Sequence, residues 1–184
     1  MATKEKVNVL LIEDNPGDIR LIKEFLAARE EVLFIVDVAR DLDDIARLSS
    51  NENYTIILCD LNLPGSNGIE TFQLVHKLFN EIPIIVQTGI NDKDLGKLAV
   101  SEGAQDYLQK GTFDDHLLYK AISYAIERHQ LVKNLTAEII SKERAKIFED
   151  IFENSSVGVY KTTCGGEFIL ANQAFVKLLG FDSF

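Results

Sequence analysis

The chain has 184 residues, of which 46% are hydrophobic, and its formal net charge at pH 7 is -10. This length suits one complete domain with a shorter appendage, and the apolar fraction is enough for a buried core. Because no stretch concentrates lysine and arginine, we expect no direct contact with nucleic acid, and the acidic balance disfavours an anionic membrane surface. The sequence shows neither a signal-peptide pattern nor a membrane-length apolar segment, so we expect a cytoplasmic protein.

Short apolar runs alternate with amphipathic stretches through the first two thirds of the chain. Five runs are expected to form strands, beginning near Val7, Val32, Thr55, Pro83 and Asp106. The helices that follow them are expected to start near Pro16, Asp41, Gly68, Asp92 and Asp114. Alternation of this kind predicts an α/β fold in which a parallel sheet is covered by helices on both faces.

Polar residues close the apolar runs in a fixed order. Glu13 and Asp14 follow the first run, Asp60 ends the third, Thr88 the fourth and Lys110 the fifth. If these strands are parallel neighbours, the three acids meet at one edge of the sheet. Repulsion between like charges at that edge would demand a cation.

This order resembles the receiver domain of two-component response regulators. The matching motifs are LLIEDNPGD, ILCDLNLPGSNG, IVQTG and DYLQKG, and the resemblance covers roughly residues 5 to 130. It implies a flavodoxin-like, doubly wound sheet of five parallel strands in the order 2-1-3-4-5. The functional site of such a fold lies at the carboxyl ends of the strands.

The resemblance also implies a metal-assisted phosphorylation site. Asp60 would accept a phosphoryl group from a phosphohistidine of a sensor histidine kinase or a phosphotransfer protein. Asp14 and Asp60, with Glu13 acting through water, would bind Mg²⁺ together with the backbone carbonyl of Asn62, and these are the hard oxygen ligands that this ion prefers.

Three further residues take roles from the same resemblance. Lys110 would pair with the incoming phosphoryl group, and Thr88 would donate a hydrogen bond to it. Tyr107 matches the aromatic residue that moves inward on activation, so that Thr88 and Tyr107 together would form the switch. Most receivers have proline after the lysine, whereas this chain has Gly111, and a different geometry is therefore expected for that loop.

Each of these residues also has a simpler interpretation. Glu13 and Asp14 could cap the first helix, and Asp60 could form a turn. Lys110 could be a solvated charge at a strand end, Thr88 an ordinary strand residue and Tyr107 a half-buried strand aromatic. A phosphohydrolase with an aspartate nucleophile is a second functional hypothesis, but such enzymes typically carry another aspartate two residues later, where this chain has Asn62. A flavin-binding module is a third, but it would need a phosphate loop where the chain has two acids.

The last expected helix has no obvious end, because neither glycine nor proline occurs between Gly111 and Gly158. We therefore expect it to continue past the receiver, from about Asp114 to Phe152. Apolar residues recur every seven positions along it, at Leu118, Ala125, Val132 and Ile139. This spacing predicts the seam of a coiled coil, through which the protein could form a homodimer.

The segment after this helix has a different pattern. Residues Val157 to Thr162 and Glu167 to Ala171 are expected to form a hairpin, followed by a helix from Asn172. This arrangement resembles the opening of a PAS sensory domain, of which only the first part is present. The expected division is a receiver at 1–127, a helical linker at 128–153 and an incomplete α+β PAS segment at 154–184. On this resemblance the longer parent protein would be a histidine kinase or, as the second possibility, a cyclic-dinucleotide synthase, although this chain would not itself be an enzyme.

Overall fold

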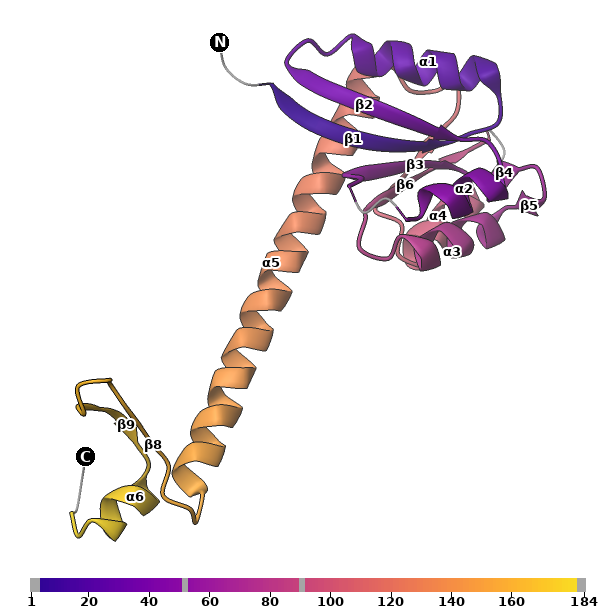
Figure 1. Cartoon of the computed structure of the whole chain (residues 1–184). Helices are drawn as coiled ribbons and strands as arrows, with labels where there is room; N and C mark the ends of the chain where they lie inside the picture. Colours follow the sequence, from indigo (N-terminus) through magenta and orange to yellow (C-terminus); the bar gives the residue numbers. More distant parts are fainter. Residues whose placement is uncertain (1–3, 51–52, 90–91, 182–184) are drawn as a thin grey trace. The chain divides into compact units, whose positions relative to one another are not determined.

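The computed structural model describes residues 4–50, 53–89 and 92–181 (Figure 1). The chain forms two compact units, Met1–Leu131 and Val132–Phe184. Each unit has its own sheet, and helix α5 (Asp115–Asn154) contributes residues to both.

The first unit contains a five-stranded parallel sheet. Its strands are β1 (Glu5–Ile12), β2 (Val32–Ala39), β3 (Ile56–Asp60), β6 (Ile84–Thr88) and β7 (Asp106–Gln109). They lie in the order β2-β1-β3-β6-β7, which is the predicted order 2-1-3-4-5 once the short strands β4 and β5 are set aside. The predicted flavodoxin-like fold is therefore confirmed. Strands β3 and β6 are buried along their whole length, as expected for central strands with helices on both faces.

Helices cover both faces of this sheet (Figure 1). One face packs against α1 (Pro16–Ala27) and the first part of α5, and the other against α2 (Leu42–Leu48), α3 (Ile69–Leu78) and α4 (Lys93–Ser101). Helix α1 begins as its sequence predicts, because the side chain of Asn15 accepts hydrogen bonds from two backbone N–H groups and Pro16 occupies the first turn. The carboxyl end of β1 and the amino end of α1 are thereby held next to each other.

One small element was not predicted from the sequence. Strands β4 (Asn62–Leu63) and β5 (Ser66–Asn67) form a two-stranded antiparallel hairpin directly after β3. Gly65 has φ +85° at its turn, a conformation that glycine adopts without the steric cost of a side chain. Two strands of two residues carry too few apolar positions to produce a pattern in the sequence.

The predicted coiled-coil seam on α5 needs a correction. Leu118 and Ala125 are fully buried in the core of the first unit, so neither can contact a second helix. Val132 and Ile139 are more than half exposed. Leu118 and Ala125 lie seven residues apart because both face the sheet. A seven-residue spacing does not distinguish a helix face that packs on a sheet from a seam between two helices. Further along α5 the large exposed apolar residues are Leu135, Ile140, Ile147, Phe148 and Ile151.

The second unit contains a hairpin of β8 (Tyr160–Thr162) and β9 (Phe168–Ala171), followed by α6 (Gln173–Leu178). Its elements are those predicted, although both strands are shorter. Asn172 is completely buried and caps α6, where its side chain accepts from the backbone N–H of Phe175. The same amide accepts from Val159 N–H and donates to the carbonyls of Phe152 and Val157, at 2.8–2.9 Å. One side chain thus joins the end of α5, the hairpin and α6.

Among the helices that the structure describes, none combines the length and the apolar character that crossing a lipid bilayer requires.

Candidate functional site

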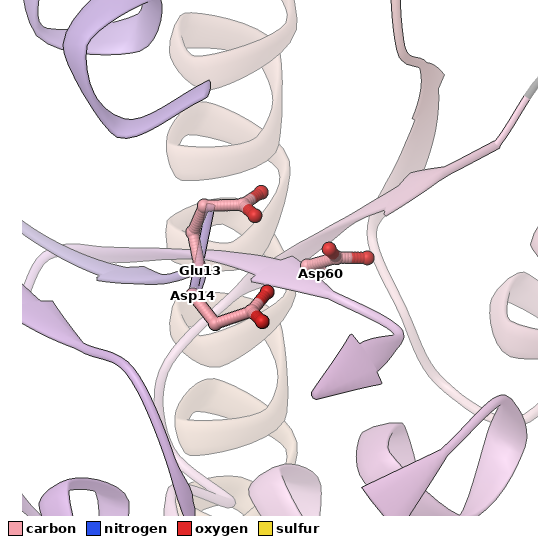
Figure 2. Close-up of side chains that lie close together, drawn as sticks. All are labelled: Glu13, Asp14 and Asp60. Carbon is pink, nitrogen blue, oxygen red and sulfur yellow. The ribbon is translucent and has the colours of Figure 1, made fainter. Parts of the chain in front are cut away.

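Three carboxylates converge at the carboxyl edge of the first sheet, as the sequence predicted. Glu13 and Asp14 follow β1, and Asp60 is the last residue of β3. Each of the three offers an oxygen that lies within 4.8 Å of the others, and Figure 2 shows the side chains close together. Glu13 and Asp60 are buried, whereas Asp14 is exposed to solvent. Three hard oxygen donors at this spacing, one of them open to solvent, fit a small divalent cation that keeps some of its waters.

Lys110 supplies a positive charge to the same cluster. Its ammonium group donates hydrogen bonds to Glu13 Oε2 at 2.7 Å, to Asp60 Oδ2 at 2.7 Å and to Asp18 Oδ2 at 2.9 Å. The three protons of the ammonium group are therefore all used. The backbone N–H of Lys110 also donates to the carbonyl of Thr88 at 2.8 Å, which fixes the loop after β7 beside the end of β6.

The protonation of the site follows from burial and from these pairings. Burial raises the pKa of Glu13 to about 6, against the hydrogen bond from Lys110, and repulsion from Asp60 adds to the increase. Burial alone would lower the pKa of Lys110, but its hydrogen bonds to the three carboxylates outweigh this and raise that pKa. Lys110 is thus cationic at neutral pH, and it offsets part of the negative charge of the cluster.

The neighbours of Asp60 hold its carboxylate in place. Its Oδ1 accepts a hydrogen bond of 3.0 Å from the backbone N–H of Asn62, at the start of the β4–β5 hairpin. Thr88, at the end of β6, is buried, and its hydroxyl has no partner among the described residues. An unpaired buried hydroxyl at this edge is a free hydrogen-bond donor.

Tyr107 is partly buried and packs against the core that β3 and β6 share with α3 and α4. Its ring lies against Gly96 of α4, where an added Cβ atom would be only 2.6 Å from Cδ2 of the ring. Gly111, in the loop after Lys110, has φ +77°, whereas proline is restricted to about -65°. The loop therefore has a geometry that proline could not adopt, in agreement with the expected departure from most receivers.

Two residues at this site were not identified from the sequence. Asp18 lies in the first turn of α1 and binds Lys110, but its position is equally suited to an acid that only stabilises the helix terminus. Gln87 pairs in register with Asp60 across β3 and β6, so the two side chains lie on the same face of the sheet. Its side chain is fully buried, and neither polar atom of its amide has a partner among the described residues. In the sequence, the only sign of its role is that a glutamine interrupts an otherwise apolar strand.

The chain belongs to the response regulator receiver domain family, whose model matches residues 9–123, and residues 146–184 match a PAS domain. It is 27% identical over 176 residues to the C4-dicarboxylate transport transcriptional regulatory protein DctD of Pseudomonas aeruginosa, an alignment that covers 95% of this chain and 37% of DctD. It is 28% identical over 211 residues to the sensor histidine kinase TmoS of Ectopseudomonas mendocina, and this alignment covers 96% of this chain and 21% of TmoS. The chain thus spans less than two thirds of the length of these relatives.

Solved structures share the fold. A receiver domain protein from Clostridium thermocellum matches with a TM-score of 0.60 and 26% identity, over 68% of this chain and 98% of that one. Full-length FixJ from B. japonicum matches with a TM-score of 0.63 and 22% identity, over 82% of this chain and 77% of FixJ.

Proposed function

We propose that this chain is a phosphorylation-dependent switch in a two-component phosphorelay and that Asp60 is its phosphoacceptor. A carboxylate oxygen of Asp60 would attack the phosphorus of a phosphohistidine on a sensor histidine kinase or a phosphotransfer protein. The P–N bond of the donor breaks and an acyl phosphate forms. The observation that carries this proposal is the convergence of Glu13, Asp14 and Asp60 within 4.8 Å, with Lys110 bound to two of them.

We propose Mg²⁺ as the ion of the site. Glu13, Asp14 and Asp60 would hold it together with the backbone carbonyl of Asn62, and the donor set consists of hard oxygens. When bound, the ion neutralises charge on the carboxylates and on the phosphoryl oxygens, which otherwise repel each other. Asn62 stands where an aspartate-dependent phosphohydrolase would have its second aspartate, and this disfavours that alternative. The acids after β1 likewise disfavour binding of a flavin phosphate.

The remaining polar groups would stabilise the phosphoryl group and detect it. Lys110 donates to Asp60 and would transfer this hydrogen bond to an oxygen of the phosphoryl group on Asp60. The hydroxyl of Thr88, which has no partner among the described residues, would turn toward the same group, and the ring of Tyr107 would move inward. Since β7 leads directly toward α5, we infer that the state of Asp60 is relayed to this helix and the PAS segment.

Incubation with acetyl phosphate and Mg²⁺, followed by measurement of the intact mass, tests this proposal. We expect one added phosphoryl group in the wild-type chain, none in Asp60→Asn, and slower modification in Asp14→Ala because a metal ligand is lost. Thr88→Ala keeps the nucleophile and the metal ligands, so it should still be modified in part while its conformational response is lost. Equal yields in wild type and Asp60→Asn would rule out Asp60 as the acceptor.

We propose the division into a receiver at 1–127, a linker at 128–153 and a PAS segment from 154, with a homodimer formed through the exposed apolar residues of α5 after Leu131. The longer parent would be a histidine kinase, as in the relative TmoS. Light scattering should find a dimer for the whole chain and a monomer for a chain that ends at Glu127. A monomer in both cases would refute dimerisation through the helix.

A further inference from the structure

Lys110 has three carboxylate partners, but they are not equivalent. Glu13 and Asp60 belong to the trio of acids that can share a divalent cation, whereas Asp18 does not. Asp18 reaches the ammonium group from a different element, the first turn of α1, at 2.9 Å. Of the three described partners of the ammonium group, Asp18 is thus the only one that would not also be a ligand of a cation held by Glu13, Asp14 and Asp60.

This difference matters when the site is occupied. A cation held by Glu13, Asp14 and Asp60 would engage oxygens of Glu13 and Asp60 and so weaken the contacts of Lys110 with both residues. Phosphorylation would replace the contact with Asp60. A lysine side chain gains considerable rotamer freedom when its partners are lost, so the remaining carboxylate of Asp18 would help to keep the ammonium group in the site.

We propose that Asp18 is a positioning residue that holds Lys110 at the acid cluster while the cation and the phosphoryl group occupy it. This inference rests on the proposed phosphotransfer function. Asp18 is joined to the acid cluster through its hydrogen bond with the ammonium group of Lys110, and we expect it to act through that group. The position of Asn15 and Pro16, which fix the start of α1 beside the end of β1, brings Asp18 within reach of Lys110.

The competing explanation is that Asp18 only stabilises the amino terminus of α1. Asp43 provides a matched control, because it also lies in the first turn of a helix, α2. Asp18→Asn and Asp43→Asn each remove one acid from a helix terminus, but only the first removes a partner of Lys110. Asp18→Glu restores the charge and tests for rescue.

Two measurements on the whole chain decide the question. With Mg²⁺ and acetyl phosphate, Asp18→Asn should be phosphorylated about two- to fivefold more slowly than wild type, which is the scale of a partly exposed ion pair. Asp18→Glu should recover part of the rate, and Asp43→Asn should match wild type. In a Lys110→Met background, Asp18→Asn should have no further effect, since its partner is gone. The second measurement is the NMR order parameter of the Lys110 Cε group in the Mg²⁺-bound chain. This order parameter should be lower in Asp18→Asn than in wild type, because the lysine side chain becomes more mobile.

The inference is overturned if Asp18→Asn leaves both the rate and the order parameter unchanged, or if it slows the reaction equally in the Lys110→Met background. If the wild-type chain accepts no phosphoryl group, the proposed function fails. The order parameter of Lys110 still tests the positioning role in that case.

Discussion

Gly96 lies on the buried face of α4, where the absence of a side chain leaves room for the ring of Tyr107. From the sequence alone this glycine only weakens a helix, and replacing it with alanine should stabilise the helix by about 1 kcal/mol. In the structure the new Cβ atom would lie 2.6 Å from Cδ2 and 2.7 Å from Cγ of the ring. Overpacking of this kind costs about 1–3 kcal/mol, so Gly96→Ala should lower the free energy of unfolding by up to about 2 kcal/mol.

A double variant separates the two effects. In a Tyr107→Ala background the ring is absent, and Gly96→Ala should then raise the free energy of unfolding by up to about 1 kcal/mol. The assay is native-state hydrogen exchange of the amides of β3 and β6, which reports on the receiver unit of the whole chain. If Gly96→Ala stabilises the protein when Tyr107 is present, the ring of Tyr107 does not lie against Gly96 of α4 as described.

Three other changes test the site and the second unit. Glu13 titrates near pH 4.5 when unfolded and near pH 6 when folded, so metal-free stability should fall by roughly 1–2 kcal/mol as the pH rises through this window. Urea titrations at several pH values should show Glu13→Gln without this loss, and a pH-independent difference from wild type would contradict it. Gln87→Met removes two buried polar atoms that have no partner among the described residues, and it should stabilise the receiver by about 1–2 kcal/mol in the same titrations. Destabilisation would mean that the amide has a partner. Asn172→Ala deletes four hydrogen bonds, and hydrogen exchange should show lost protection in the β8–β9 hairpin with β3 unchanged; intact protection would refute the joining role of this residue.

Local patterns in the sequence predict the alternation of strands and helices and the acids at the strand ends, whereas the strand order was implied by the resemblance to receiver domains. Buried parallel strands have continuous apolar runs, and the first polar residue after each run must lie at the carboxyl edge of the sheet. The patterns place Glu13, Asp60 and Lys110 at that edge, and the resemblance to receiver domains supplied the strand order that makes them neighbours. Their distances followed only from the structure.

The features that were missed depend on which neighbour a side chain meets. An acidic residue in the first turn of a helix is favourable with or without a partner, so the sequence does not reveal the contact of Asp18 with Lys110. Leu118 and Ala125 fit a seam between helices as well as a face against the sheet. Gly96 appeared as a defect in a helix until the ring of Tyr107 was placed beside it.

The central claim is that the carboxylate of Asp60 becomes an acyl phosphate. Reduction with sodium borohydride after phosphorylation converts an aspartyl phosphate into homoserine, and peptide mass spectrometry then locates the converted residue. We predict homoserine at position 60, dependent on Mg²⁺ and on the phosphoryl donor. Homoserine at another aspartate, or a stable phosphate on a hydroxyl or imidazole side chain with position 60 unchanged, would contradict the claim.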